Sequence, residues 1–295
     1  MAKVVEICGS PGVGKSTIFE EIIRRKSRED SWTTATNVNP YDEQSWLDFA
    51  KKIAREIRKG KKTLSNSRIE ENNYEFVRRI YKDIKNGKDY VDQTALKEAG
   101  DRFVAQFPEY LEACWGNIYL KQRKSSNGMD LRFEKAEFIY RIIKKIQVLR
   151  ENASGKYIII DEGLINMIDR GLYKSTSPLE EKEEIYNLLE VMPLPDAIVY
   201  LETDLRENAK RLLSRRDIRD MHRGLSIDGL VAITKACRDR IVTSINFLED
   251  KGIPVLYLDS SQPVRLNADK IITFTKSLNR SMPTAKTEHA ATVSA

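Results

Sequence analysis

The chain has 295 residues, of which 41% are hydrophobic and 32% are charged, and its net charge is +6. This composition predicts a soluble globular protein, either one elaborated domain or a domain with a large insert. It contains no run of 18 apolar residues and no apolar signal-peptide centre, so we expect no membrane span and a cytoplasmic location. Three scattered cysteines (Cys8, Cys114 and Cys237) and two histidines argue against a disulfide framework, a zinc site and a histidine-based triad.

The first apolar run, Val4–Cys8, leads directly into the sequence G-S-P-G-V-G-K-S. The run predicts a buried strand, and Gly9–Ser16 fits the phosphate-binding pattern G-x-x-x-x-G-K-[ST]. Its glycines let backbone N–H groups converge on phosphate oxygens at the positive end of the following helix. Lys15 can reach the β- and γ-phosphates, and the Ser16 hydroxyl can hold magnesium. The predicted nucleoside triphosphate site comprises Gly9, Ser10, Pro11, Gly12, Val13, Gly14, Lys15, Ser16 and Thr17.

A second apolar run, Thr33–Val38, precedes a long segment, residues 39–149, that we interpret as helices joined by polar breaks. Because this segment is too long for a simple crossover, we expect a helical cap. Open α/β sheets bind ligands beyond the carboxyl ends of their strands, and we expect the cap there. Asn37, Tyr41 and Arg132 are candidate substrate contacts.

The predicted insert also carries the whole positive excess of the chain, with 23 Lys and Arg against 17 Asp and Glu. Its most basic part is residues 51–62, which can follow a nucleic-acid backbone or an acidic partner. The same lysines and arginines also fit the exposed face of an amphipathic helix, because apolar residues recur there at helical spacing. Both interpretations stay open.

A third apolar run, Tyr157–Asp161, ends in two acids followed by glycine. In a phosphate-loop protein, this position supplies the carboxylate that orients magnesium, so Asp161 is the candidate metal ligand. Glu162 is the candidate base, because a carboxylate beside the metal site can accept a proton from an attacking hydroxyl or water. The alternative is that the acids only cap the next helix.

Two further strands are predicted at Ala197–Leu201 and Val255–Leu258, and the first leads into a capped helix with arginines near its end. Arg211 and Arg215 are four residues apart, so we expect them on one helical face over the donor nucleotide. Arg219 follows in a polar loop that can fold over a transferring phosphoryl group. The alternative is a solvated basic helix end.

The motifs G-S-P-G-V-G-K-S, I-I-I-D-E-G, Y-L-E-T-D-L-R-E-N-A-K-R-L-L-S-R-R and V-L-Y-L-D-S-S-Q-P-V together resemble the P-loop nucleoside and nucleotide kinases, in particular thymidylate kinases. The resemblance covers residues 1–38 and 150–278. It implies a three-layer α/β/α fold with a five-stranded parallel sheet in the order 2-3-1-4-5, here with a large helical insertion. It also implies that Arg211 and Arg215 contact ATP, that a mobile lid follows, and that Asp259 lies in the adenine-side loop. Where members of the family have Asp-Arg-Tyr/Ser or Glu-Arg-Ser after the third strand, this chain has Asp161-Glu162-Gly163, so an arginine of the family motif is missing.

The sequence therefore predicts a kinase core over residues 1–38 and 150–278, an insert over 39–149 and a disordered tail over 279–295. The expected reaction is transfer of the γ-phosphoryl group of Mg-ATP to a small acceptor, a nucleoside or nucleotide, with Arg215 and Arg219 meeting the developing charge. Two alternatives stay open: a regulatory or defence ATPase whose insert binds nucleic acid or protein, and a polynucleotide 5′-hydroxyl kinase. A homodimer also stays open.

Overall fold

The computed structural model describes residues 2–26, 30–34, 93–120, 131–152, 155–168, 177–215, 222 and 224–278. Several predicted features lie outside these ranges: Asn37, Tyr41, Arg219, the basic segment 51–62 and the tail 279–295.

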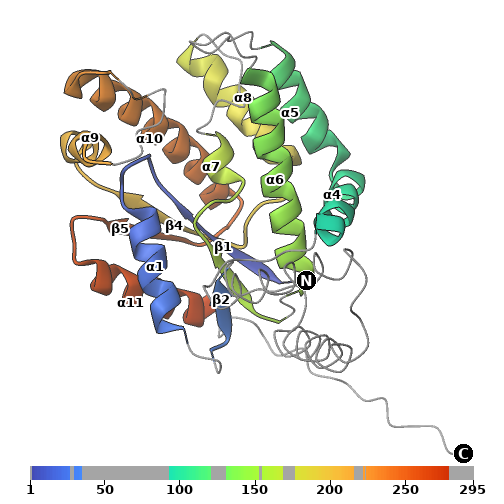
Figure 1. The fold of residues 1–295 in the computed structure, drawn as a ribbon, viewed down its shortest axis with the longest axis horizontal. Coiled ribbons are helices and arrows are strands. Elements are labelled where there is room, and N and C mark those ends of the chain that lie inside the picture. Colours follow the sequence, from blue (N-terminus) through green and yellow to red (C-terminus); the bar gives the residue numbers. More distant parts are fainter. Residues whose placement is uncertain are drawn as a thin grey trace, which may run out of the picture.

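A five-stranded parallel sheet forms the centre of the fold (Figure 1). Its strands are β1 (Lys3–Cys8), β2 (Trp32–Thr34), β3 (Tyr157–Ile160), β4 (Ala197–Glu202) and β5 (Val255–Asp259). They lie in the order β2-β3-β1-β4-β5, which confirms the predicted topology. The central strands are rich in Val and Ile because helices cover both of their faces. Of the predicted second strand, residues 35–38 lie outside the described residues.

Helices cover the sheet on both faces, so the fold has three layers, α/β/α (Figure 1). The described helices are α1 (Lys15–Arg25), α4 (Gln93–Gln106), α5 (Pro108–Leu120), α6 (Leu131–Asn152), α7 (Ile165–Ile168), α8 (Pro178–Val191), α9 (Leu205–Leu213), α10 (Ile227–Asp250) and α11 (Val264–Leu278). Helices α1 and α11 pack against one face, whereas α5, α6, α7, α8 and α10 share the core of the other. None of these described helices is long and apolar enough to cross a bilayer.

Two helices begin at the side-chain caps that their sequences predict. Ser177 caps α8 by accepting a hydrogen bond from the backbone N–H of Glu180 at 3.3 Å, and Pro178 occupies the first helical position. Asp204 caps α9 by accepting hydrogen bonds from Arg206 and Glu207 at 2.9 and 3.0 Å. The second cap fixes where α9 leaves the carboxyl end of β4, beside the phosphate loop.

The described part of the predicted insert packs on the sheet as part of its core. Tyr110 and Cys114 of α5 belong to the same buried cluster as Cys8 of β1 and Tyr200 of β4. Helix α6 runs without interruption across the predicted boundary at residues 149–150. These helices therefore cover one face of the sheet in addition to any role beyond the strand ends.

Candidate functional site

The phosphate loop, Gly9–Gly14, connects β1 to α1, which begins at Lys15. Gly12 has a φ of +89°, and a Cβ atom there would lie 2.7 Å from Asn208 Oδ1 and 2.8 Å from Leu212 Cγ. Both of those side chains belong to α9. Only glycine fits this combination of backbone conformation and close approach, so the loop is shaped by packing against α9.

Three residues of the predicted nucleotide site, Ser10, Val13 and Thr17, do not line the cavity beside the loop. Ser10 is buried, and its Oγ accepts a hydrogen bond from Asn208 Nδ2 at 2.7 Å. The Val13 side chain is fully buried in the core, and its carbonyl oxygen accepts a hydrogen bond from Arg211 Nη1 at 3.4 Å. Thr17 is exposed on α1 and does not line the cavity described next. Ser10 and Val13 therefore hold the loop in shape.

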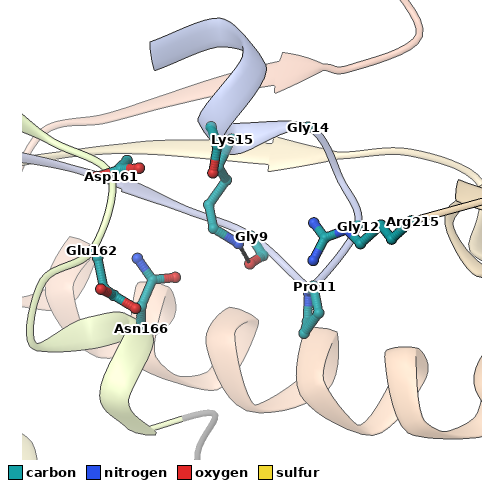
Figure 2. A pocket seen from close by; sticks show the side chains of 10 residues that line it. Gly9, Pro11, Gly12, Gly14, Lys15, Asp161, Glu162, Asn166 and Arg215 are labelled. Atoms are coloured by element: carbon teal, nitrogen blue, oxygen red, sulfur yellow. Dashed lines mark hydrogen bonds between the residues drawn. The ribbon is translucent and has the colours of Figure 1, made fainter. Parts of the chain in front are cut away.

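A cavity of about 200 Å³ lies beside the phosphate loop (Figure 2). It is lined by Gly9, Pro11, Gly12, Gly14, Lys15, Ser16, Asp161, Glu162, Asn166 and Arg215. The fold thus brings the loop, the two acids after β3 and one arginine from the end of α9 to one place. Figure 2 shows the acids and Asn166 on one side of the cavity and Arg215 on the other, with Lys15 between them.

The Lys15 side chain folds over the phosphate loop. Its Nζ donates hydrogen bonds to the carbonyl oxygen of Gly9, marked in Figure 2, and to that of Ser10 at 3.2 Å. These two carbonyl groups hold a positive charge in the cavity, where phosphate oxygens are the natural counter-ions. The contact fixes the ammonium group close to where the loop presents its backbone N–H groups.

Two oxygen donors suited to magnesium line the same cavity. Ser16 contributes a hydroxyl at the beginning of α1, and Asp161 contributes a carboxylate directly after β3. Burial raises the pKa of the Asp161 carboxyl, and the nearby positive charges of Lys145 and Lys15 oppose that shift. Hard oxygen ligands, one or two of them from protein, together with substrate phosphates, are what Mg²⁺ takes in nucleotide sites. The residues present therefore fit the ion.

Glu6, which the sequence did not reveal as a site residue, supports the segment after β3 that carries the acidic side of the cavity. It is 1% exposed, and its carboxylate accepts hydrogen bonds from the backbone N–H groups of Ile165 and Asn166 at 3.2 and 2.9 Å. Burial raises the pKa of Glu6 from 4.5 to about 7, although these hydrogen bonds act in the opposite direction. A Cβ atom at Gly163 would clash with the Glu6 carboxylate, so the chain passes closely over it. The sequence did contain a signal for Glu6, because it is a charged residue inside an otherwise apolar strand.

The two arginines near the end of α9 contact different parts of the site, and their shared position over a nucleotide stays a prediction. Helix α9 ends at Leu213, and Ser214 forms its C-cap. Arg215 follows this cap and lines the cavity. Arg211 stays on the helix and donates from Nη1 to Val13 O and, at 3.2 Å, to Ser260 Oγ.

The loop after β5 lies next to the phosphate loop through this Arg211 contact. Asp259 is the last residue of β5, and its carboxylate accepts hydrogen bonds from the Ser261 N–H at 2.8 Å and from Ser261 Oγ at 2.6 Å. These hydrogen bonds lower the pKa of Asp259. Its side chain thus shapes the loop and does not line the cavity. Arg132, the described member of the predicted substrate contacts, is half-buried near the start of α6 and does not line it either.

Comparisons with known proteins give a coarse match at the level of structure. No protein-family model matches the sequence, and no curated protein does. The chain is similar to a solved structure of deoxyadenosine kinase from M. mycoides with the products dCMP and a flexible dCDP bound. The two have 14% sequence identity and a TM-score of 0.37 over 93% of this chain and 99% of that chain. At this low similarity, the roles of residues in this chain are inferred from its own cavity and not from that enzyme.

Proposed function

We propose that this chain is a phosphotransferase that moves the γ-phosphoryl group of Mg-ATP to a small acceptor, a nucleoside or nucleotide. One observation carries the proposal: a single cavity is lined by a phosphate loop with its lysine, by Asp161 and Glu162, and by Arg215. Phosphoryl transfer needs positioning and charge neutralisation more than covalent chemistry, and this set of groups supplies both.

The donor side of the cavity consists of the phosphate loop, Lys15 and Arg215. Loop N–H groups and the start of α1 attract phosphate oxygens, and Lys15 exchanges its carbonyl partners for the β- and γ-phosphates. Arg215 reaches the cavity from the opposite side to the acids, where a guanidinium neutralises charge that develops on the transferring group. Ser16 and Asp161 would hold magnesium, which would supply positive charge to offset the negative charge of the phosphates.

Glu162 is the proposed general base. Its carboxylate lines the cavity beside Asp161, and the side chain lies next to that of Asn166 in Figure 2. A carboxylate at this position can accept the proton of an attacking hydroxyl as that oxygen approaches the γ-phosphorus. Arg211 and the loop at Ser260 extend the donor site away from the phosphates, so we propose them for the base of the nucleotide.

A switch ATPase is the second candidate, because Glu162 would position a water molecule equally well. In that case the attacking group is water, the products are ADP and inorganic phosphate, and turnover responds to a macromolecular partner. The same two acids line the cavity in either case, so the nature of the nucleophile distinguishes the candidates.

ADP release from Mg-ATP, measured with and without a panel of nucleosides and nucleoside monophosphates, tests the proposal. A phosphotransferase releases ADP faster when its acceptor is added, because the acceptor is consumed in the same step. Acceleration by at least one panel member supports the proposed function. A rate that no member changes, but that oligonucleotides or protein partners stimulate, supports the ATPase.

A further inference from the structure

Asn166 lines the cavity, although nothing in the sequence pointed to it. It lies in α7, the four-residue helix that follows the two acids, and it is 9% exposed. Its backbone N–H donates to Glu6 Oε1 at 2.9 Å, which ties the start of α7 to the middle of β1. A buried amide that faces a cavity has a fixed direction, and that direction decides which ligand groups it can bind.

The contacts of Asn166 Nδ2 determine how the carboxamide is oriented. This nitrogen donates to Glu6 Oε1 at 3.1 Å and to the carbonyl oxygen of Ile7 at 2.9 Å. The opposite orientation would place Asn166 Oδ1 against the Ile7 carbonyl oxygen, which can only accept hydrogen bonds. Because both Nδ2 hydrogens are used by protein groups, the amide offers the cavity only its oxygen, which points into it in Figure 2.

The oxygen of Asn166 adds to a side of the cavity that is already rich in hydrogen-bond acceptors. Asp161 and Glu162 contribute carboxylates there, whereas Lys15 and Arg215 supply positive charge elsewhere in the cavity. A phosphate group placed against Asn166 and Glu162 would meet two acceptor groups and gain no hydrogen bond from them. A hydroxyl or amine, in contrast, donates to such groups.

We infer that Asn166 Oδ1 accepts a hydrogen bond from an O–H or N–H group of the phosphoryl acceptor, and that the acceptor reacts through a neutral hydroxyl rather than a phosphate. Glu6 is a positioning residue that holds the Asn166 amide in this orientation. The inference rests on the proposed function and narrows its substrate class. In the reaction, the bond between the γ-phosphorus and ADP breaks, a bond to the hydroxyl oxygen forms, and the hydroxyl proton passes to Glu162. The products are ADP and a phosphate monoester.

The first test uses the wild-type protein and needs no variant. Mg-ATP is supplied with nucleosides, which offer hydroxyls, or with the corresponding nucleoside monophosphates, and the phosphorylated product is identified. Phosphorylation of a nucleoside hydroxyl is expected. Phosphorylation of monophosphates alone, on their phosphate group, would overturn the inference and leave the proposed phosphotransferase intact, whereas phosphorylation of neither class would overturn both.

The second test compares Asn166→Ala with Asn187→Ala, a control at an exposed asparagine of α8. Losing one hydrogen bond to the acceptor should raise its KM about tenfold, while the Kd for Mg-ATP changes by less than about twofold. The control should change neither constant. An unchanged acceptor KM in Asn166→Ala would overturn the assignment of this residue.

Glu6→Gln tests the positioning role. The substitution keeps the size of the side chain but replaces one carboxylate oxygen with an NH2 group, so one oxygen is left for the Ile165 N–H, the Asn166 N–H and the Asn166 amide together. We expect a higher acceptor KM with little change in the Kd for Mg-ATP, which also reports that the variant is folded. A purely structural role would instead raise the acceptor KM and the Kd for Mg-ATP by the same factor, and that result would overturn the positioning role.

Discussion

Asn208 donates a hydrogen bond from Nδ2 to Ser10 Oγ at 2.7 Å and so fastens α9 to the phosphate loop. Both residues are buried, and the same helix also packs against Gly12 and reaches Val13 O through Arg211. The loop conformation therefore depends on a helix almost two hundred residues away in the sequence. This contact makes Asn208 a support of the nucleotide site that does not itself line the cavity.

Asn208→Ala should lower the free energy of unfolding by about 2 kcal/mol, because it leaves the Ser10 hydroxyl without this donor and opens a small void. It should also weaken Mg-ATP binding severalfold, because the loop loses support. Urea unfolding and calorimetric titration measure the two effects. Asn246→Ala, at an exposed asparagine of α10, is the matched control. Wild-type values of both quantities in Asn208→Ala would contradict the role.

Lys15→Ala should weaken Mg-ATP binding by about a hundredfold or more, because a charged donor to two phosphates is lost. The fold should stay intact, since Lys15 Nζ donates to carbonyl groups of its own loop. Calorimetric titration together with thermal unfolding measures both properties. Lys210→Ala, at an exposed lysine of α9, should bind Mg-ATP normally. Undiminished affinity in Lys15→Ala would remove the basis of the nucleotide site.

The arginines at the end of α9 should have separable effects. Arg211 contacts Ser260 and the phosphate loop, so Arg211→Ala should mainly raise the Kd for Mg-ATP. Arg215 lines the cavity, so Arg215→Ala should mainly lower kcat, by about tenfold to a hundredfold, through lost charge neutralisation. Steady-state kinetics with calorimetric titration distinguish the two outcomes. The same changes in kcat and in the Kd for Mg-ATP in both variants would contradict the prediction that the two arginines have separate roles.

The sequence predicted the sheet well because its signals are local. Four of the five predicted strands are short runs rich in Val, Ile and Leu, and such runs become buried strands wherever helices cover both faces. The phosphate loop was equally readable, because glycines such as Gly12 are required by its backbone geometry.

What the sequence did not reveal depends on contacts between distant segments. Glu6 interrupts an apolar strand, but its partners at Ile165 and Asn166 are known only once β1 and β3 lie side by side. Arg215 was expected on a helical face, yet α9 ends two residues earlier, and helix ends are the least predictable boundaries. The predicted roles of the loop residues and the arginines remain predictions.

Glu6 also gives the fold a pH dependence. Because burial raises its pKa from 4.5 to about 7, the folded chain binds this proton more tightly than the unfolded chain. The resulting stabilisation is fully present below the unfolded pKa and is lost as pH rises through the folded pKa. The stability of the wild type relative to Glu6→Gln should therefore fall by about 3 kcal/mol between about pH 4.5 and pH 8. Urea unfolding of both proteins at several pH values measures this difference in stability. A difference that does not change with pH would contradict the prediction.

Glu162→Gln should separate acceptor phosphorylation from nucleotide binding. An amide cannot accept the hydroxyl proton, so acceptor-dependent turnover should fall about a hundredfold or more, while the Kd for Mg-ATP stays near the wild-type value. The slow hydrolysis without acceptor should hardly change. A switch ATPase would behave differently, because the same variant would lose basal hydrolysis and retain ATP in the site.

The fate of the γ-phosphoryl group tests the central claim most directly. Wild-type protein is incubated with γ-labelled ATP, magnesium and the panel of nucleosides and nucleotides, and the labelled products are separated by thin-layer chromatography. The proposed phosphotransferase predicts that label appears on an organic acceptor in step with ADP. Label that appears only as inorganic phosphate, at a rate indifferent to every nucleoside and nucleotide, would contradict it.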